Sequence, residues 1–245
     1  MKVLAFDTAT RASSVALWDT DGFDPPREAR DDPSPGERPG HARCLLPLIA
    51  GLMESSGTDW AGIDRLAVGV GPGTFTGLRI GIATARALSR ARRIPLVGVS
   101  TLESLALGAR LDPRLPSGIE TLLSVIDARR REVFAAGWRL GEDPSAVAPL
   151  PSLRPRALRP ERLASVIAGL SERVIAVGDG AVEFREVLES SGASIPADDS
   201  ELHRVSAANH CRLAARKQAG KPDQVSPEYL RLPDAEIGHR NADKQ

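Results

Sequence analysis

Residues 69–81 read GVGPGTFTGLRIG, a stretch with five glycines that runs into a helical pattern. Glycine-rich loops at the start of a helix often bind phosphate through free backbone N–H groups. A Walker loop needs glycines five positions apart and then a lysine, and the dinucleotide fingerprint needs intervals of two and then three. Neither spacing occurs, and Phe75 stands at the centre of Gly73 and Gly77, where a hydrolase elbow would place its nucleophile. The stretch therefore matches none of these chemical motifs.

The interval of four between Gly73, Gly77 and Gly81 points to packing instead. A helix expected over residues 76–92 has two stripes of small or apolar residues at 100° per residue. One stripe contains Gly77, Gly81, Thr84, Leu88 and Ala91, and the other contains Leu78, Ile82, Ala85 and Ser89. Glycine in a helix costs about 0.5–1 kcal/mol relative to alanine, so two of them suggest that another backbone comes close. The helix is either a central core helix or one that also faces a protein partner.

Each half of the chain opens with a strand, a polar turn that contains an aspartate, and a second strand. The strands are expected over residues 3–6 and 14–18 around Asp7, and over residues 121–126 and 133–138 around Asp127. Helices are also expected over residues 41–53, 101–107, 181–190 and 206–218 and from 161, and strands over 65–70, 96–99 and 174–177. This alternation predicts an α/β fold with two similar domains, residues 1–109 and 110–231, followed by a loose polar tail over 232–245.

Composition excludes several classes of protein. Lys+Arg and Asp+Glu both total 32, so the chain has no overall field that would attract nucleic acid or a membrane. Aromatic residues make up 4% of the chain, which argues against a base-stacking surface. The two cysteines cannot form a disulfide framework, and no segment reads as a signal peptide or a membrane span. We expect a soluble, cytoplasmic protein.

The chain resembles the TsaB family in a series of motifs. These are FDTAT at residues 6–10, His41 followed by LLPLI at 45–49, GVGPGTFTGLRIG at 69–81, IDAR at 126–129 and PEYLR at 227–231. The resemblance covers the chain in order from Met1 to about Arg231. It implies two domains of the actin-like, sugar-kinase and Hsp70 type, also called ribonuclease-H-like, which agrees with the repeated strand–turn–strand pattern.

The resemblance implies a function in making N6-threonylcarbamoyladenosine at position 37 of tRNAs. It implies a non-catalytic subunit that pairs with the catalytic subunit TsaD, beside the ATPase TsaE, while TsaC makes the threonylcarbamoyl-adenylate donor. TsaD-like paralogues carry H-x-x-x-H after the strand that follows the glycine-started helix, and these histidines bind the metal. Thr101 and Leu105 occupy those places here, and neither is a credible ligand for a transition metal. We therefore expect no catalytic residue, no metal site and no enzyme activity of this chain.

Partner binding is expected on the first two helices of the chain. The residues expected at the interface with TsaD are Leu45, Ile49, Leu52, Gly77, Leu78, Gly81, Ile82 and Ala85. The same surface would allow a homodimer when the chain is alone, and contact with tRNA is expected to be indirect.

The two aspartate turns stand where the actin-like fold places its phosphate loops, and a glycine pair resembles an adenosine-side signature. The residues concerned are Asp7, Thr8, Asp127, Gly178 and Gly180. They either hold Mg²⁺ with ATP or ADP at the interface of the complex, or they are turn-forming residues without a cofactor. The alternative function is an enzyme, either an actin-like-fold nucleotide-binding hydrolase or a peptidase-like protein.

Two further kinds of polar cluster have a structural and a functional interpretation. His41 with Cys44, and His203 with His210, lack the additional ligands of a zinc site, which favours structural roles. The arginines at positions 129–131 and at 154, 156, 159 and 162 either lie on solvated faces or contact tRNA phosphates without reading base sequence.

Overall fold

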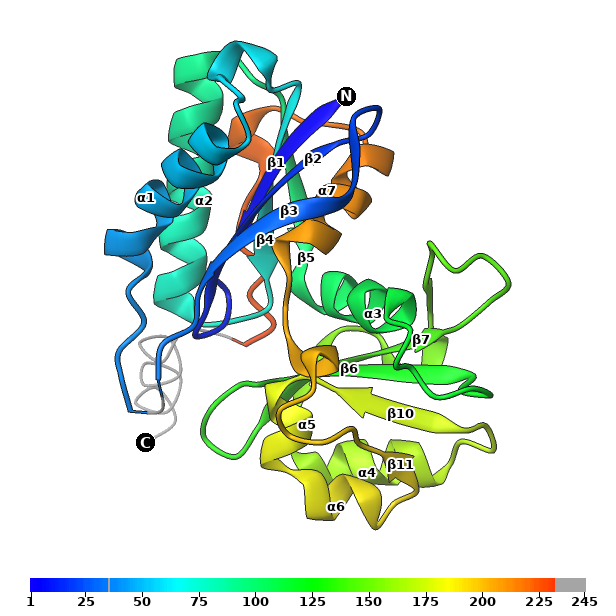
Figure 1. Cartoon of the computed structure of the whole chain (residues 1–245). Helices are drawn as coiled ribbons and strands as arrows, with labels where there is room; N and C mark the ends of the chain where they lie inside the picture. The colour runs from blue at the N-terminus through cyan, green and yellow to red at the C-terminus, as the bar shows by residue number, and fades with distance from the viewer. Residues whose placement is uncertain (35, 232–245) are drawn as a thin grey trace, which may run out of the picture.

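The computed structural model describes residues 1–34 and 36–231 and shows two α/β domains, one above the other in Figure 1. The first domain contains the strands β1 (Lys2–Asp7), β2 (Ser13–Asp19), β3 (Phe23–Asp31), β4 (Arg65–Gly71) and β5 (Leu96–Ser100). The second contains β6 (Thr121–Asp127), β7 (Val133–Arg139), β8 (Ala148–Pro149), β9 (Arg156–Leu158), β10 (Val174–Val177) and β11 (Ala193–Ser194).

The two sheets repeat one topology. The first has the order β3-β2-β1-β4-β5, and the second has the order β11-β10-β6-β7-β8, with β9 also paired to β7. β1 is antiparallel to β2 and parallel to β4, which is parallel to β5. In the same way β6 is antiparallel to β7 and parallel to β10, which is parallel to β11. The predicted fold class, α/β with two similar domains, is confirmed.

Helices cover both faces of each sheet. They are α1 (His41–Ser55), α2 (Phe75–Arg92), α3 (Thr101–Leu111), α4 (Pro160–Ala168), α5 (Asp179–Glu183), α6 (Arg185–Glu189) and α7 (Ala207–Arg216). Short 3₁₀ turns lie at η1 (Trp60–Gly62), η2 (Pro151–Leu153), η3 (Glu201–His203) and η4 (Pro222–Gln224). α1 and α2 pack on one face of the first sheet and α7 on the other, while α3 lies between the two sheets (Figure 1). Within the described part of the chain, no helix is both long and apolar enough to span a bilayer.

The apolar run in β1 follows from burial on both faces of the sheet. Leu4 and Phe6 belong to the core beneath α1 and α2, whereas Val3 and Ala5 belong to the core beneath α7. Successive side chains of a strand point to opposite faces, so a strand covered on both sides is apolar between its ends. β1 is therefore the central strand of the first domain.

The chain returns to the first domain before its end. α7 packs against β1 and β2, and its side chains Ala207, Cys211 and Leu213 belong to the core on that face of the first sheet. The prediction that residues 110–231 form the second domain is wrong in this respect, because the apolar face of α7 finds its partner on the first sheet. The predicted tail over residues 232–245 lies outside the described residues.

Most element bounds agree with the predictions to within a few residues. α2 begins at Phe75 and α1 extends to Ser55. The helix expected over residues 181–190 is divided into α5 and α6, which meet at Phe184. The backbone of Phe184 has φ −113° and ψ 29°, which is not helical and interrupts the run.

The glycines of residues 69–81 allow the turn after β1 to lie directly against α2. A Cβ atom at Gly77 would stand 1.9 Å from the carbonyl oxygen of Thr8, and one at Gly73 would stand 2.4 Å from that of Ala9. The Thr74 N–H donates to the Ala9 oxygen at 2.7 Å, and the Thr8 hydroxyl donates to the Gly77 oxygen at 2.7 Å. The predicted close approach of another backbone is confirmed, and that backbone belongs to the same chain.

Gly77→Ala and Gly51→Ala form a matched pair that tests this packing. Both glycines are helical, but a Cβ atom at Gly51 in α1 would meet nothing within 4 Å. We expect Gly51→Ala to raise the free energy of unfolding by about 0.5–1 kcal/mol, because alanine loses less backbone entropy. We expect Gly77→Ala to lower it by about 1–3 kcal/mol or more, because the methyl group overlaps a backbone oxygen. Urea denaturation of both variants measures the difference, and similar changes of the same sign would contradict the packing argument.

Candidate functional site

Asp7 lies at the end of β1 inside a sealed polar cluster. Its side chain is 1% exposed, and its Oδ1 accepts a hydrogen bond from the Ala9 N–H at 2.7 Å. Its Oδ2 accepts a hydrogen bond from the Thr101 hydroxyl at 3.1 Å and lies 3.0 Å from Nε2 of His210. The geometry of this close contact falls outside that of a standard hydrogen bond. Both carboxylate oxygens are therefore already in use.

The same cluster contains a serine, a histidine and an aspartate in the spatial order of a hydrolase triad. Ser104 Oγ of α3 lies 2.8 Å from Nδ1 of His210 in α7, whose other nitrogen faces Asp7. A catalytic triad needs an exposed nucleophile and an adjacent oxyanion site. Ser104 and His210 are both 0% exposed, so a peptide substrate cannot reach the hydroxyl. The arrangement is a buried hydrogen-bond network.

The charge of Asp7 is stabilised in place. Burial by itself raises the pKa of this carboxyl group, but His210, the Ala9 N–H and the Thr101 hydroxyl outweigh it and hold the pKa below its ordinary value. Gly69 in β4 makes room for the group, since a Cβ atom there would stand 1.8 Å from Oδ2. The Gly69 backbone, Thr101 and His210 thus lie close around this oxygen.

Asp127, the counterpart of Asp7 at the end of β6, has a different environment. Its Oδ1 accepts the Arg129 N–H at 2.7 Å, and its Oδ2 pairs with the Arg129 guanidinium at 3.0 Å. Its own N–H donates to Oδ1 of Asp179 at 2.9 Å. The carboxylate is half-buried and shapes the loop that follows it.

Gly178 and Gly180 allow the turn after β10 to pack on β6. Gly178 has φ +113°, and a Cβ atom there would stand 2.1 Å from the Val125 oxygen. One at Gly180 would stand 2.8 Å from the Asp127 nitrogen. The Gly178 N–H donates to Nδ1 of His203 at 3.0 Å, which gives that histidine a structural role.

The expected nucleotide residues do not converge on one cavity. A cavity of about 240 Å³ is lined by residues of both domains, and of the five residues only Gly178 lines it. Small-molecule sites usually enclose about 300–1,000 Å³. Asp7 and Thr8 are buried at the end of β1, whereas Asp127 ends β6 and Gly180 lies in α5 against it. The geometry favours the interpretation of these residues as turn-forming and packing residues.

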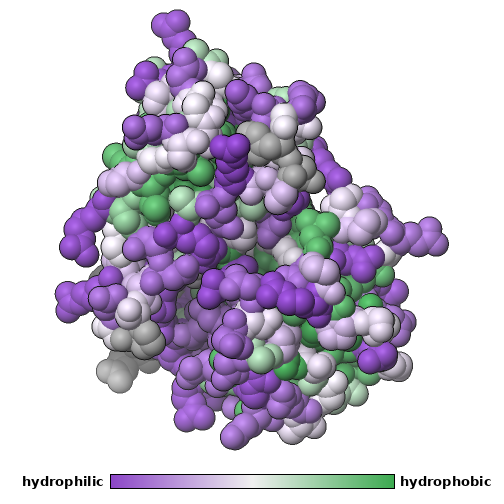
Figure 2. Space-filling model, viewed as in Figure 1, coloured by the Kyte–Doolittle hydropathy of each residue, from purple (hydrophilic) through white to green (hydrophobic). Residues whose placement is uncertain are grey.

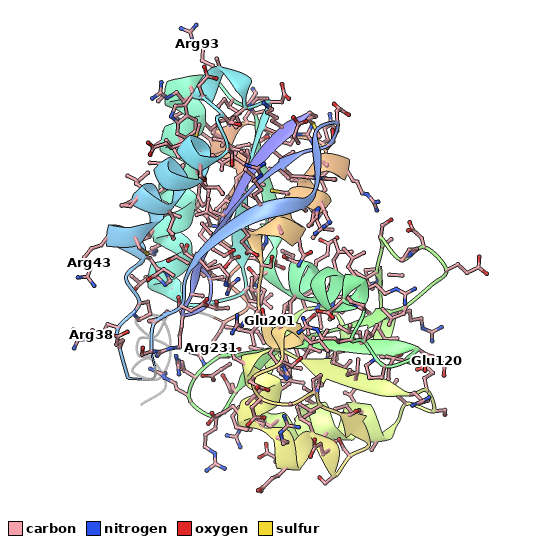
Figure 3. All side chains as sticks on the ribbon, viewed as in Figure 1. Arg38, Arg43, Arg93, Glu120, Glu201 and Arg231 are labelled. Carbon is pink, nitrogen blue, oxygen red and sulfur yellow. The ribbon has the colours of Figure 1, made fainter. Side chains whose placement is uncertain are left out.

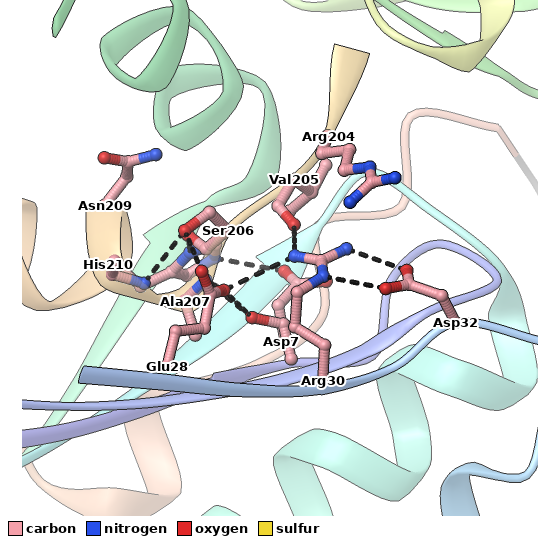
Figure 4. Close-up of polar contacts among 12 residues, drawn as sticks. Asp7, Glu28, Arg30, Asp32, Arg204, Val205, Ser206, Ala207, Asn209 and His210 are labelled. Atoms are coloured by element: carbon pink, nitrogen blue, oxygen red, sulfur yellow. Dashed lines mark hydrogen bonds and ion pairs between the residues drawn. The ribbon is translucent and has the colours of Figure 1, made fainter. Parts of the chain in front are cut away.

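Polar contacts from β3 hold the segment through which the chain returns to the first domain (Figure 4). Arg30 Nη1 donates to the Val205 oxygen at 2.7 Å, and its guanidinium also pairs with Asp32. Glu28 accepts the Ser206 hydroxyl at 2.9 Å and the Ala207 N–H at 3.0 Å, at the N-terminus of α7. A carboxylate at this end of a helix is favoured by the helix dipole. These contacts connect the edge strand of the first domain to the crossing segment.

The residues expected at the partner interface lie in the chain's own core, which corrects the prediction. Leu45, Ile49, Leu52, Leu78, Ile82 and Ala85 are at most 6% exposed, and Gly77 and Gly81 are buried. α2 thus turns the stripe of Leu78 and Ile82 and the glycines of the other stripe toward its own sheet and the turn after β1, whereas Ala91 at the end of that other stripe is exposed. The exposed positions of the two helices include Leu46, Ala50, Gly51, Ala83 and Ala87, which we call the outer helix face. Neighbouring residues of a helix point in different directions. The position of Leu46 directly after the buried Leu45 was therefore the sequence signal for an exposed leucine on α1.

The remaining histidine and cysteine candidates have structural partners. His41 is buried, its Nδ1 lies 2.7 Å from Ser13 Oγ, and Cys44 donates to the same oxygen at 3.2 Å. Across residues 1–34 and 36–231, no group of three or more His, Cys, Asp or Glu side chains could hold a metal ion. The prediction missed the pairing of His210 with Asp7 and the contacts of Glu28 and Arg30, because these partners lie far apart in sequence.

Asp7→Asn and Asp127→Asn are matched variants that test the buried pair. Asp7→Asn leaves His210 buried without its carboxylate, and breaking a buried pair in this way costs about 3–5 kcal/mol. Asp127→Asn removes a pair whose arginine is 60% exposed, and we expect a loss of at most about 1 kcal/mol. Denaturant unfolding at pH 7 measures both, and equal losses would show that the Asp7 contact is not structural.

The stability difference between wild type and Asp7→Asn should depend on pH. The folded-state pKa of Asp7 is lowered from 3.8, so its contribution is fully present above the unfolded-state pKa and is lost as the pH falls through the folded value. We expect the difference to be constant near neutral pH and to shrink on acidification below about pH 4. Unfolding curves between pH 7 and pH 3 measure it, and a difference that grows toward low pH would contradict the assignment.

Comparisons with known proteins extend these observations. The family model described as TsaD, tRNA N6-adenosine threonylcarbamoyltransferase, matches residues 37–148. A transferase of that name from Erythrobacter litoralis is 38% identical over 71 residues, which cover 29% of this chain and 21% of the relative. The solved structure of YeaZ from Pseudomonas aeruginosa superposes with a TM-score of 0.75 at 28% identity, and covers 94% of this chain and 99% of that one.

The similarity to one curated protein extends over nearly the whole of both chains. The tRNA threonylcarbamoyladenosine biosynthesis protein TsaB of Escherichia coli is 33% identical over 242 residues. The match covers 94% of this chain and 95% of the relative. The chain belongs to the TsaB family of tRNA threonylcarbamoyladenosine biosynthesis proteins.

Proposed function

We propose that this chain is a non-catalytic cytoplasmic subunit that pairs with TsaD and activates it. The reaction served is threonylcarbamoyl transfer to adenosine 37 of tRNAs, with TsaE acting beside the pair. The observation that carries the proposal is the outer helix face, a surface of small and apolar side chains on two adjacent helices. In the absence of TsaD, the same face would pair two copies of this chain.

The outer helix face has the properties of a helix-packing interface. Leu46 is 54% exposed, and Ala50 and Gly51 extend its surface along α1. Ala83 and Ala87 are exposed on the neighbouring α2, and Figure 2 shows apolar side chains over α1 at the left of the molecule. Small side chains let the ridges of a partner helix approach closely. The match to the TsaD family model includes both helices, which supports a partner with a similar helix pair.

The environments of Thr101 and Leu105 support an activating rather than a catalytic role. These residues stand where the resemblance places the metal-binding histidines of TsaD-like chains. The Thr101 hydroxyl is engaged by Asp7, and Leu105 is fully buried in the core between α3 and the second sheet. Both side chains thus contribute to the packing of this chain, and neither is placed as a metal ligand.

The alternative functions receive less support. The peptidase-like hypothesis would require Ser104 to contact a substrate, but this residue is fully buried. The nucleotide-hydrolase hypothesis would require Asp7 to orient Mg²⁺ and water, but both carboxylate oxygens of Asp7 already accept hydrogen bonds.

Charged substitutions on the outer helix face test the pairing. Leu46→Asp and Ala83→Glu lie at exposed positions, so we expect the isolated chain to stay folded. We expect each to weaken TsaD binding at least about 100-fold, because an unpaired carboxylate would be buried at the interface. Ala168→Glu, at an exposed alanine of α4, is the matched control. Titration by calorimetry measures the affinities, and wild-type affinity of both variants would refute the assigned face.

The non-catalytic role predicts a strict dependence on TsaD. With tRNA and threonylcarbamoyl-adenylate but without TsaD, we expect no modified adenosine above the protein-free background. With TsaD, TsaE and ATP, we expect this chain to raise the yield. Mass spectrometry of digested tRNA measures the product. Modification by the isolated chain, or ATP hydrolysis that Asp7→Asn abolishes without unfolding the protein, would favour the enzymatic alternative.

A further inference from the structure

The loop between β6 and β7 carries three consecutive arginines in an unusual backbone conformation. Arg129, Arg130 and Arg131 have φ values of +63°, +56° and +59°. Residues other than glycine, asparagine and aspartate rarely adopt this left-handed backbone conformation, and when they do they mostly occur singly. All three are exposed, so packing of their side chains does not explain the conformation. Residues with such rare backbone conformations cluster at functional sites.

Backbone contacts hold this loop, which leaves its side chains directed outward. The Arg129 N–H donates to Asp127 at 2.7 Å, and its carbonyl oxygen accepts the Glu132 N–H at 3.1 Å. The Ala128 N–H donates to the Glu132 oxygen at 3.0 Å and closes the turn. The loop therefore presents its arginines from a fixed base, at a lower cost in ordering than a flexible tail.

The carboxylates near the loop do not neutralise all of its arginines. Asp127 pairs with Arg129, and Glu132 pairs with Arg231 at 2.9 Å. Arg131 has no ion pair with any residue in the described ranges 1–34 and 36–231. The three arginines line an open hollow of about 530 Å³, whose remaining lining residues are Asp127, Glu183 and Phe184. One cation at least remains available on an open surface.

The position of the loop relates it to the outer helix face. In Figure 1 the loop (green) leaves the second domain on the same side of the molecule as α1 and α2. Figure 3 shows Arg38 and Arg43 projecting from the first domain on that side. A partner bound to α1 and α2 would therefore share this side of the chain with any large polyanion that the complex holds.

We propose that the loop of residues 129–131 binds phosphate groups of the tRNA backbone in the complex. The proposal rests on the proposed function, which supplies the tRNA. Arginine forms two parallel hydrogen bonds to phosphate, and an open, exposed site suits an extended polyanion better than a small enclosed ligand. Contacts to phosphate carry no base information, so the contact adds affinity without reading sequence. It assigns to this chain a direct contact with tRNA.

The test is the salt dependence of tRNA binding by the complex of this chain with TsaD. Each phosphate contact contributes a slope of about 0.9 to the fall of log affinity with log salt. We expect Arg131→Gln to reduce the slope by about 0.9, and Arg129→Gln with Arg130→Gln and Arg131→Gln to reduce it by at least the same amount. Lysine at all three positions should restore most of the slope, because it keeps the charge. Fluorescence anisotropy with labelled tRNA between 50 and 300 mM KCl measures these slopes.

Arg93→Gln is the matched control for Arg131→Gln. Arg93 is also an exposed arginine in the left-handed region, with φ +56°, and Figure 3 shows it at the far end of the first domain. We expect it to leave the slope unchanged. A slope for Arg131→Gln and the triple variant equal to that of the control would overturn the proposal.

Separate readouts distinguish this proposal from the proposed function. Affinity for TsaD is measured without RNA, and its absence in the wild-type chain would refute the pairing. The slopes of the isolated chain would then decide the RNA contact. If the triple variant instead weakens binding to TsaD or TsaE and leaves the RNA slope unchanged, the loop is a protein contact and the RNA proposal is wrong.

Discussion

The buried contact between Asp7 and His210 joins β1 to α7, the last α-helix of the described residues, and the first domain is arranged around it. An ionised carboxylate in a protein core is unfavourable unless its charge and its lone pairs are met. β1 supplies Asp7, β4 supplies the open position at Gly69, α3 supplies Thr101, and α7 supplies His210. These elements must be in place together, and this requirement returns the chain to its first domain.

The two halves share one strand order but use the aspartate that follows their first strand differently. In the first half Asp7 is sealed beneath α3 and α7, and α2 packs on the turn after it through its glycines. In the second half Asp127 is half-buried and supports an exposed loop of arginines. Both halves therefore contain the aspartate turn, but its polar groups are buried in the first half and lie at the surface in the second.

These differences agree with the proposed function, in which the chain acts through its exterior. Asp7 at the end of β1 is enclosed by the chain's own side chains, whereas the arginines of the β6–β7 loop are exposed. This arrangement suits a chain that acts through what it contacts. Family membership agrees, because it places the chain in a biosynthetic route that also includes a transferase of related sequence.

The sequence by itself determined the α/β class, the duplication, most element bounds and the lack of histidines at positions 101 and 105, because these depend on local periodicity and residue identity. It also indicated that a backbone lies close to Gly77. Only the tertiary structure decided which backbone this is, which face of α2 is free, to which domain α7 belongs, and that His210 meets Asp7. The periodicity of a helix shows which residues share a face, but two apolar stripes look alike until neighbouring elements cover them. Contacts between distant segments depend on how the chain closes on itself, and no local pattern records that closure.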